Sequence, residues 1–265
     1  MKNIKIYKVD AFTNKLFSGN PAAVCPLDDW LPDAVMQSIA LENNLSETAF
    51  FIKDKDKFFL RWFTPKVEID LCGHATLATA HIIYTEMDYQ SDNIAFNIKS
   101  GDVLNVTRIQ NKLTMNFPAH DPKIIDQNLD ELSDIFGFRP TLFLNSNYGL
   151  AVFNNEEEIV KIEPNLNALE KLSYNGIIVT APGQNVDFVS RFFGPKLGIP
   201  EDPVTGGAHC SLIPYWSKRL NKKDMIAMQL SKRGGVIFCS YLNDRVNMGG
   251  EAITYMQGEI LLDNV

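Results

Sequence analysis

The chain has 265 residues, which fits one large domain or two of moderate size with enough material for a core. Apolar residues make up 45% and charged residues 22%, and the net charge of −7 with scattered lysines and arginines argues against a protein that binds nucleic acid or a membrane surface. Charges interrupt the N-terminal stretch every few residues, unlike a signal peptide, and no apolar run approaches the ~20 residues that cross a bilayer.

Cysteine usage indicates a reducing compartment. The four cysteines lie far apart, at positions 25, 72, 210 and 239, and they form no C-x-x-C pair. A chain of this size does not need disulfide bonds for its stability. We therefore expect a reduced protein located in the cytoplasm.

Apolar runs of strand length alternate with helix-like segments along the first half of the chain. The strands are predicted from apolar residues at every second position or in short runs, and the helix from spacings of three to four. In chain order, the predicted elements are a strand at residues 4–12, a helix at 31–44, strands at 48–52 and 57–63, and a hairpin over 103–119 that turns near Gln110 and Asn111.

The second half continues this mixture of helices and strands. Residues 155–173 are typical of a helix that Pro164 breaks into pieces. The tail from Met228 to Leu262 is rich in strand-forming residues, with glycines at positions 234, 235, 249 and 250. No low-complexity tract interrupts the alternation.

Two stretches of the chain are similar to each other. RWFTPKVEIDLCGHATLATAHIIY begins at Arg61, and RFFGPKLGIPEDPVTGGAHCSLIPYW begins at Arg191. Both start with Arg-aromatic-Phe-x-Pro-Lys, and both reach a glycine that opens a helix-like run of small residues, 12 residues after the arginine in the first copy and 15 in the second. A repeat of this length is too long for a solenoid unit and predicts two similarly built domains that face each other across a cleft.

The domain boundary is expected near the stretch FPAHDPKIIDQN, where Pro118 and Pro122 flank polar residues. We therefore predict an N-terminal barrel domain over residues 1–118 and a C-terminal barrel domain over residues 119–265. The last strand is a candidate to pack back on the N-terminal domain.

The glycine before each small-residue run, Gly73 or Gly206, is a candidate anion-binding position. The first turn of a helix has unpaired N–H groups and the positive end of the helix dipole. A glycine there lets a carboxylate or phosphate approach the backbone closely. Either glycine could equally serve only a tight turn, but the duplication favours a binding role. In the second copy, Pro214 falls inside the expected helix and would kink it.

Three side chains are candidates for proton transfer or substrate contacts. Glu47 lies between a helix and an apolar strand, where burial would raise its pKa toward a useful range, although a solvated charge is the commoner role of a lone glutamate. Asp202 precedes a proline and a glycine-rich turn, so it could anchor a substrate or cap the turn. His74 could exchange a proton near neutral pH, or only make a hydrogen bond at the helix start.

The possible metal ligands near the two turns do not form a familiar site. They are Cys72, His74, His81, His209 and Cys210. None has the spacing of H-E-x-x-H or of paired C-x-x-C motifs. His81 also lies two helical turns after His74, which is too far for both to bind one ion comfortably. We therefore expect no metal.

A nucleophilic thiol would need an activating base. Cys72 is close to His74 in sequence, but residues this close do not reliably face each other on a helix. A racemase with two thiols would also need a cysteine at the matching turn, where the second copy has Thr205. The internal comparison therefore argues against a symmetric pair of thiols.

The same comparison bears on Glu47. Its counterpart in the second copy falls near Asn175 or Gly176. Only one half of the chain therefore supplies a carboxylate at this place, which suits an enzyme with a single proton shuttle.

Four motifs resemble those of the PhzF family of phenazine biosynthesis-like isomerases. They occur in the family's order between residues 9 and 210, and they read VDAFTNKLFSGNPAAVC, LSETAFF, RWFTPKVEIDLCGHATLATAH and EDPVTGGAHC. The resemblance implies the diaminopimelate-epimerase fold, an α+β architecture of two similar domains with pseudo-two-fold duplication. Each domain would be a mixed sheet wrapped as a barrel around a central helix, and these helices would follow Gly73 and Gly206.

The resemblance also implies roles for single residues. Glu47 matches the general acid/base of the family's S-E-T motif, and His74 and Asp202 match residues that contact the substrate. The substrate carboxylate would be held by backbone amides at the two glycine turns, at Gly73, Gly206 and Gly207. Family members often carry a serine where this chain has Gly207, so a hydroxyl donor to the substrate is missing here.

The resemblance implies that no cofactor and no metal take part, and that the protein forms a homodimer. The expected partner is a small-molecule carboxylate, with no nucleic acid and no membrane. The leading hypothesis is a cofactor-independent isomerase in which Glu47 shifts a proton on a small, cyclic carboxylate in the interdomain cleft. Two alternatives stay open, namely a thiol-dependent amino-acid epimerase or racemase that uses Cys72, and a non-catalytic protein that binds small carboxylates.

Overall fold

The computed structural model describes residues 2–262, and its internal contacts divide the chain into two compact units. Unit 1 comprises Met1–Asn116 and Gly249–Val265, and unit 2 comprises Phe117–Met248. The domain limits inferred from the sequence, with a boundary at residue 118, stay a prediction. Each unit has its own sheet and its own buried helix.

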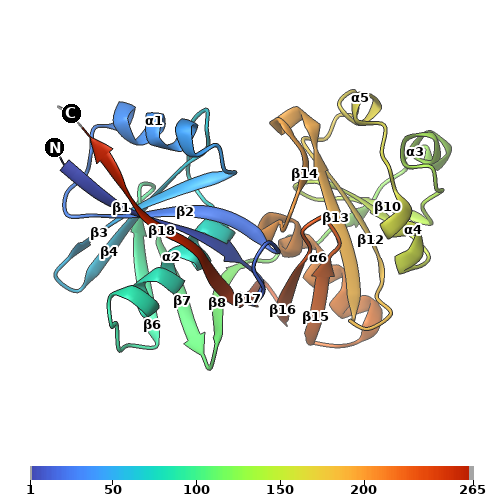
Figure 1. Ribbon diagram of the computed structural model, residues 1–265. Coiled ribbons are helices and arrows are strands. Elements are labelled where there is room, and N and C mark those ends of the chain that lie inside the picture. Colours follow the sequence, from blue (N-terminus) through green and yellow to red (C-terminus); the bar gives the residue numbers. More distant parts are fainter. Residues whose placement is uncertain (1, 263–265) are drawn as a thin grey trace. The chain divides into compact units, whose positions relative to one another are not determined.

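Unit 1 is a mixed sheet wrapped around a central helix (Figure 1). The strands pair in the order β18–β1–β2–β3–β4–β6–β7–β8, with β5 beside β4. The strands are β1 (Lys2–Ala11), β2 (Asn20–Leu27), β3 (Glu47–Asp54), β4 (Lys57–Phe63), β5 (Glu68–Ile69), β6 (Asn93–Ile98), β7 (Val103–Ile109), β8 (Lys112–Pro118) and β18 (Ala252–Leu262). The helices are α1 (Asp33–Asn43) and α2 (Gly73–Glu86).

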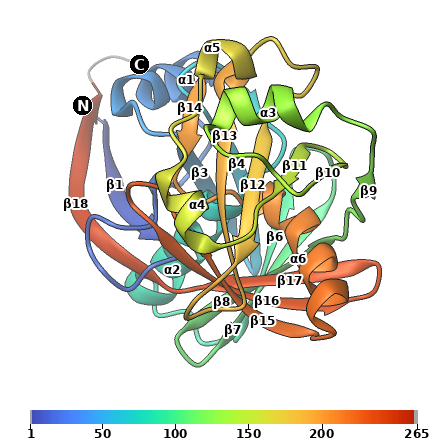
Figure 2. The same ribbon diagram turned by 90° about the vertical axis from the view of Figure 1, so that its right-hand side faces the viewer.

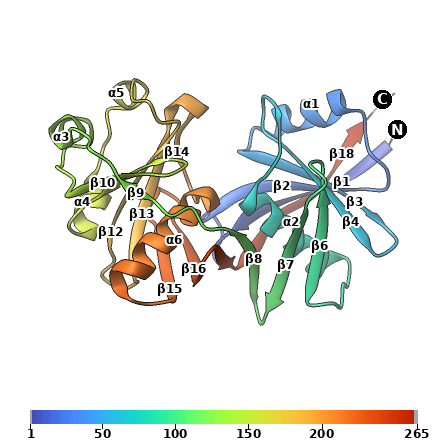
Figure 3. The ribbon, with the colours of Figure 1, turned by 180° about the vertical axis from the view of Figure 1, so that it is seen from behind.

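Helix α2 is the centre of unit 1. Seven consecutive residues, from His74 to Ala80, are all buried. Because successive helical residues point 100° apart, a buried run of this length means that the helix is covered on all sides. Figures 1 and 3 show it enclosed by the strands of unit 1 from two opposite directions. Alanines and threonines in this run allow the strands to approach closely.

Helix α1 covers the outer face of the unit 1 sheet. Ile6 of β1 and Met36 of α1 are buried in the core between them. The helix ends at Asn44, which adopts a left-handed conformation with φ 48°. This residue type tolerates that conformation. The chain then enters β3, so the turn places Glu47 at the first position of the strand.

Unit 2 repeats this plan. Its strands pair in the order β9–β10–β11–β12–β13–β15–β16, with β14 beside β13. They are β9 (Lys123–Ile124), β10 (Leu142–Asn145), β11 (Gly149–Val152), β12 (Ile177–Pro182), β13 (Phe188–Gly194), β14 (Ile199–Asp202), β15 (Asp224–Gln229) and β16 (Gly235–Leu242), and β17 (Arg245–Gly250) leads the chain out of the unit. The helices are α3 (Leu129–Phe136), α4 (Glu156–Lys161), α5 (Leu166–Leu169), the 3₁₀ turn η1 (Pro195–Leu197) and α6 (Gly206–Leu220).

The outer helices α3, α4 and α5 cover one face of this sheet (Figure 2). Phe136, Ile159 and Leu169, one from each helix, are buried in the same core as Val179 of β12. The central helix of unit 2 is α6, whose residues from Ala208 to Pro214 are buried without a break.

Helix α6 continues through Pro214, where the sequence predicts a kink. A proline cannot donate the hydrogen bond that would end on the carbonyl of Cys210, four residues earlier. In unit 2 this carbonyl accepts a bond of 2.9 Å from the backbone N–H of His120 instead. The buried acceptor is therefore satisfied, and the helix runs on to Leu220.

The internal repeat is visible in the strand pairings. β2–β3 and β11–β12 are parallel, β3–β4 and β12–β13 are antiparallel, and β4–β6 and β13–β15 are again parallel. The arginines that open the two similar stretches have matching roles. Arg61 binds Glu68 through two hydrogen bonds of 2.7 and 2.9 Å, and Arg191 binds Glu201 through two of 2.7 and 3.1 Å. Each pair fixes the loop that leads into a central helix.

The predicted elements are confirmed in type and in place. Helix α1 occupies the predicted helix at 31–44, and the β7–β8 hairpin turns at Gln110, whose φ is 57°. The helical segment at 155–173 is divided into α4 and α5 on either side of Pro164. No helix within residues 2–262 is long and apolar enough to span a bilayer.

Candidate active site

Glu47 lies inside unit 1, with 8% of its surface exposed. It is the first residue of β3, where the strand pairs with Ala22 of β2. The turn before it is fixed by Asn43, whose amide donates to Thr48 Oγ1 at 3.1 Å. The solvated charge that the sequence allowed as its commoner role is therefore wrong, because a buried carboxylate needs partners.

The partners of Glu47 come from the start of helix α2. His74 Nε2 lies 3.0 Å from Glu47 Oε2, and His74 is itself only 7% exposed. On the other side of the ring, Cys72 Sγ lies 3.5 Å from His74 Nδ1. Cys72 and His74 contact each other because Cys72 is the residue before the helix and has an extended backbone, with φ −144° and ψ 111°.

The contact between Glu47 and His74 is close but bent. Neither Glu47 Oε2 nor His74 Nε2 makes a hydrogen bond of ordinary geometry with any residue of the described chain, although both atoms are buried. The contact is therefore an ion pair in which the N–H group of His74 does not point directly at the Glu47 carboxylate. Buried groups with unused hydrogen-bonding capacity are uncommon, and at a site they are available to a ligand.

Electrostatics keep this cluster charged. Burial raises the pKa of Glu47, but the attraction of the His74 cation 3.0 Å away outweighs it and leaves the pKa below its ordinary value. Burial lowers the pKa of His74, but Cys72 and Glu47 outweigh burial and raise it well above its ordinary value. Glu47 is thus a carboxylate and His74 an imidazolium at neutral pH. The raised pKa predicted for Glu47 from the sequence is wrong, because the buried carboxylate lies beside the positively charged His74, which lowers its pKa.

The Cys72 thiol is the neutral member of the cluster. Burial and the nearby Glu47 carboxylate raise its pKa above the ordinary value, against the opposing effect of His74. A thiol in this state is protonated at neutral pH, so it is not a nucleophile, and its sulfur accepts the Nδ1–H of the His74 imidazolium.

The same three residues are the cluster best placed to hold a metal ion, since their ligand atoms lie within 4.8 Å of one another. Their directions do not suit one ion. A metal takes a single imidazole nitrogen, whereas Cys72 faces Nδ1 of His74 and Glu47 faces Nε2. The arrangement of Cys72 and Glu47 on the two nitrogens of the His74 ring therefore suits the sharing of protons with this ring better than the tetrahedral coordination of one metal ion.

The backbone of helix α2 adds hydrogen-bond donors to the cluster. No side chain of the described residues caps the first turn, and no acidic side chain lies in it. Gly73 is the first residue of the helix, so its N–H group and those of His74 and Ala75 have no backbone acceptor within the helix, whereas the N–H of Thr76 donates to the carbonyl of Cys72 at 3.2 Å. An anion beside Glu47 and His74 would meet these donors and the positive end of the dipole.

Unit 2 has no carboxylate that matches Glu47. Phe50 pairs with Arg61 in unit 1, and Val179 pairs with Arg191 in unit 2. Three residues before each of these strand positions stand Glu47 and Gly176, so the predicted counterpart is confirmed. A side chain at Gly176 would come within 2.3 Å of the Phe192 ring. The cluster is therefore built in one unit alone.

The second glycine turn carries a different set of polar groups. Asp202 Oδ2 accepts a hydrogen bond of 2.6 Å from Thr205 Oγ1. The amide of Gln229 donates to the carbonyl of Asp202 at 2.7 Å and accepts from the N–H of Thr205 at 2.9 Å. Asp202 thus stabilises the turn into α6, which is one of the two roles predicted for it. Its contact with a substrate stays a prediction.

Gly206 and Gly207 open α6 without needing to be glycines for the fold. A Cβ atom on Gly206 would have no atom within 4 Å, and one on Gly207 would make an ordinary contact of 3.5 Å with the Tyr148 hydroxyl. Neither glycine has a left-handed backbone. The space above the turn is therefore open, which agrees with the close approach of a ligand that the sequence suggested for Gly206.

His81, His209 and Cys210, the remaining candidate metal ligands, are in local surroundings that keep them uncharged. His81 Nε2 is 3.0 Å from Thr254 Oγ1, and burial lowers the pKa of His81 to about 4. His209 Nδ1 donates to the carbonyl of Thr205 at 2.8 Å, and its pKa is lowered by burial to about 4. Burial raises the pKa of Cys210 to about 12. These three side chains are therefore uncharged at neutral pH, and their role is structural.

Sequence reasoning missed Gln229 and Tyr148 at the second turn. Gln229 ends strand β15 and Tyr148 precedes β11, so both are far along the chain from Gly206. No spacing or motif marks them. Only the pairing of β15 with β13 brings Gln229 beside the turn.

Comparison with known proteins identifies the fold and the family. A hydroxyproline epimerase from Agrobacterium vitis, solved with bound trans-4-hydroxy-L-proline, has the same fold with a TM-score of 0.63 at 8% identity, over 99% of this chain and 93% of that one. A PhzF-family crystal structure from Enterococcus faecalis has a TM-score of 0.96 at 46% identity and covers 98% of this chain and 100% of its own. The predicted epimerase-like α+β fold is thereby confirmed.

A relative from Pseudomonas aeruginosa that is named an uncharacterized isomerase is 46% identical over 98% of this chain and 99% of its own length. The expectation of an enzyme of the isomerase class is thus confirmed at the level of the family. The model of the phenazine biosynthesis-like protein family matches residues 9–258. The resemblance of the four motifs is confirmed, and the chain belongs to the PhzC-PhzF family of phenazine biosynthesis-like proteins.

Proposed function

We propose that this protein is an isomerase that shifts a proton on a small carboxylate, with Glu47 as both general base and general acid. The observation that carries the proposal is the buried Glu47 carboxylate held 3.0 Å from His74 at the start of α2. Buried titratable groups with strongly shifted pKa values are typical of sites that transfer protons.

The proposed reaction moves one proton and needs no cofactor. Glu47 takes a proton from a carbon beside a carbonyl group or a carbon–carbon double bond, and the electron pair of that C–H bond moves into the conjugated system. The protonated Glu47 then returns the proton to another carbon. His74 stays an imidazolium, so it stabilises the negative charge that has passed from Glu47 to the substrate.

The state of Glu47 restricts the substrate class. A carboxylate whose pKa is lowered is a weak base. It can deprotonate carbon only where the resulting anion is delocalised, as in a conjugated acid. We propose that the substrate carboxylate binds the N–H groups at Gly73, where the helix dipole is favourable. In unit 2, Gly206, Gly207 and Asp202 are proposed to make substrate contacts as well.

A thiol-dependent epimerase is the second candidate, because Cys72 touches His74 at 3.5 Å. Two observations count against it. The thiol is held protonated by burial and by Glu47, and the matching residue of unit 2 is Thr205 rather than a cysteine. In a Cys72→Ala variant, we expect isomerisation to continue at a rate within about tenfold of the wild type, because a hydrogen bond of ~1 kcal/mol is lost. A complete loss of turnover would favour the thiol mechanism.

Deuterium exchange separates an enzyme from a protein that only binds carboxylates. We would incubate the protein in D₂O with a panel of small carboxylates that includes trans-4-hydroxy-L-proline and unsaturated cyclic acids, and record proton NMR spectra over time. An isomerase exchanges a carbon-bound proton of its substrate or converts it into an isomer. A panel member that binds tightly but never exchanges would favour the non-catalytic alternative. The expected homodimer stays a prediction that light scattering would test.

A further inference from the structure

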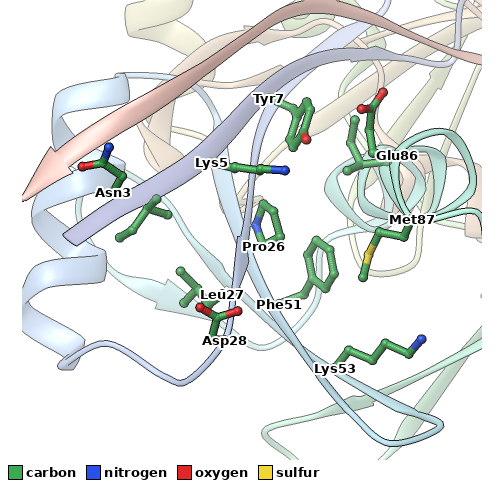
Figure 4. A pocket seen from close by; sticks show the side chains of 12 residues that line it. Asn3, Lys5, Tyr7, Pro26, Leu27, Asp28, Phe51, Lys53, Glu86 and Met87 are labelled. Carbon is green, nitrogen blue, oxygen red and sulfur yellow. The ribbon is translucent and has the colours of Figure 1, made fainter.

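A cavity of about 620 Å³ lies in unit 1 beside the C-terminal end of α2. It is lined by β1, β2, β3 and the last turn of α2, and Figure 4 shows the side chains that surround it. Glu86 is the last residue of α2, 13 residues after Gly73. At 1.5 Å per residue, the helical residues that line the cavity, Ile82 and Glu86, lie about 13 to 20 Å along the helix from Gly73 and the Glu47–His74–Cys72 cluster. It is therefore a separate site.

The cavity exists because β1 and β2 separate. Their pairing ends at Tyr7 and Val24. Beyond this point β1 continues to pair with β18 as far as Lys2, and β2 continues to pair with β3 as far as Leu27. Pro26, which has no N–H group, lies on the separated part of β2 and could not restore a full ladder. The opening is thus part of the strand arrangement.

Unpaired charges of both signs surround this opening. Lys5, Asp28 and Glu86 line it, and none of them makes an ion pair within 4 Å with any residue of the described chain. Figure 4 shows Lys5 extending from β1 past Tyr7 toward the end of α2 that carries Glu86. Glu259, opposite Lys5 on β18, accepts a hydrogen bond of 3.0 Å from Asn3. Lys5 and Glu86 thus offer a cation and an anion on two walls of one cavity.

The surface between these charges is apolar. Pro26 and Phe51 lie side by side in the middle of the cavity, and Met87 lies on its far wall (Figure 4). Lys53 also lines the cavity, but its ammonium group lies 5.7 Å from the centre of the Phe58 ring and 5.9 Å from that of Tyr89. The Lys53 ammonium group therefore interacts partly with these two aromatic rings, outside the cavity. The volume falls in the range of about 300 to 1,000 Å³ that is typical of small-molecule sites.

The end of α2 favours a positive group beside Glu86. The last turn contains no basic side chain, and the carbonyl groups there carry the negative end of the helix dipole. An ammonium group at this wall would meet Glu86 and these carbonyls. A carboxylate a few ångströms away would meet Lys5. We infer that the cavity binds a free amino acid with an apolar side chain, as a zwitterion held between Lys5 and Glu86 over Pro26 and Phe51.

This inference does not depend on the proposed isomerase. The test uses L-leucine as the probe on the full-length ¹⁵N-labelled protein, with 4-methylpentanoate and 3-methylbutylamine as analogues that lack one charge each. We expect L-leucine to shift the amide resonances of Lys5, Tyr7 and Glu86 in a saturable manner. The two analogues should bind at least about tenfold more weakly, since each loses a charge-assisted contact. Shifts confined to the amides around Gly73, or equal affinity for 4-methylpentanoate, would overturn the assignment.

Two variants test the charged walls, and two serve as matched controls. Lys5→Met and Glu86→Gln should each weaken L-leucine binding by about tenfold or more. Lys8→Met, on the same strand but outside the cavity, and Glu42→Gln, at an exposed position of α1, should leave the affinity unchanged. Unchanged binding in Lys5→Met and Glu86→Gln would contradict the site. Because these side chains lie at the surface of the cavity, we expect each variant to remain folded. A thermal melt checks this.

Discussion

The Glu47–His74 pair illustrates how a buried charge persists. An isolated carboxylate inside unit 1 would become protonated, because burial penalises its charge. The imidazolium 3.0 Å away reverses this tendency, and each partner shifts the pKa of the other in the direction that keeps the pair ionised. The pair therefore holds a base and a cation ready at one place without water between them.

The buried His74 and His209 and the half-buried His81 are predicted to titrate differently. In an NMR titration, the His74 imidazolium should persist well above pH 6.5, whereas His81 and His209 should stay neutral down to about pH 4. The reason is that only His74 has a carboxylate beside it. In Glu47→Gln the pKa of His74 should fall, and those of the other two histidines should not move. A His74 pKa that is indifferent to Glu47 would contradict the ion pair.

The same pair predicts a pH-dependent contribution to stability. The lowered pKa of Glu47 means that its contribution is present above about pH 4.5 and is lost as the pH falls through the folded value. The raised pKa of His74 means that its contribution is complete below about pH 6.5 and is lost as the pH rises through the folded value. The free energy of unfolding of the wild type relative to Glu47→Gln should therefore be largest between these limits. A difference that stays constant from pH 3 to pH 9 in urea titrations would count against this account.

At the scale of elements, two glycines of unit 2, Gly176 before β12 and Gly206 at the start of α6, are present for different reasons. Gly176, the residue before β12, is required by packing, since a Cβ would lie 2.3 Å from the Phe192 ring. Gly206, at the start of α6, has free space above it. A glycine that the fold does not need is a candidate for a functional position.

This difference gives a matched pair of variants. Gly176→Ala should lower the free energy of unfolding by about 1–3 kcal/mol, because the new methyl group overpacks the site. Gly206→Ala should change it by less than about 0.5 kcal/mol but should weaken substrate binding, since the methyl group stands where a ligand would approach. Urea unfolding measures the first effect and the Michaelis constant measures the second. Full activity in a well-folded Gly206→Ala variant would remove this turn from the site.

At the scale of the whole molecule, the first and last strands pair with each other in unit 1. Strand β18 pairs with β1 along its full length, from Ala11 with Ala252 to Lys2 with Leu262. Ile260 also packs against the core between α1 and the sheet. The last strand therefore closes the unit that contains Glu47.

Removal of this strand should affect unit 1 selectively. A chain that ends at Gly250 leaves β1 with one partner strand instead of two over its paired length. Hydrogen exchange should then show loss of protection in β1 and β2, whereas the α6 amides of unit 2 serve as the internal control and should stay protected. Equal protection of β1 in the shortened and full-length chains would show that β18 contributes little to the fold.

The sequence predicts the plan of the molecule better than its contacts. The repeat that starts at Arg61 and Arg191 predicts the doubled topology, because each copy has a strand, a turn and a small-residue helix in the same order along the sequence. The contact of Glu47 with His74, 27 residues away, was not predicted, although the family resemblance assigned both residues to the substrate site. Spacing alone could not show it, since it depends on the register of β3 beside β2.

Other features had no signal in the sequence. Cys72 reaches His74 because the residue before a helix is extended, whereas helical spacing suggested that the two do not face each other. Helix α6 survives Pro214 because His120 supplies the missing hydrogen bond from another segment. The amino-acid cavity depends on where the pairing of β1 and β2 ends, which no local pattern records.

The central claim is that Glu47 carries the transferred proton. It is tested most directly by the rate of deuterium incorporation from D₂O into a substrate, compared between the wild type, Glu47→Gln and the surface control Glu42→Gln. We predict that Glu47→Gln lowers the rate by about 10²- to 10⁴-fold while substrate binding and the thermal melt are retained, since this is the typical contribution of a general acid/base. Glu42→Gln should match the wild type. An exchange rate in Glu47→Gln equal to that of the wild type would contradict the account.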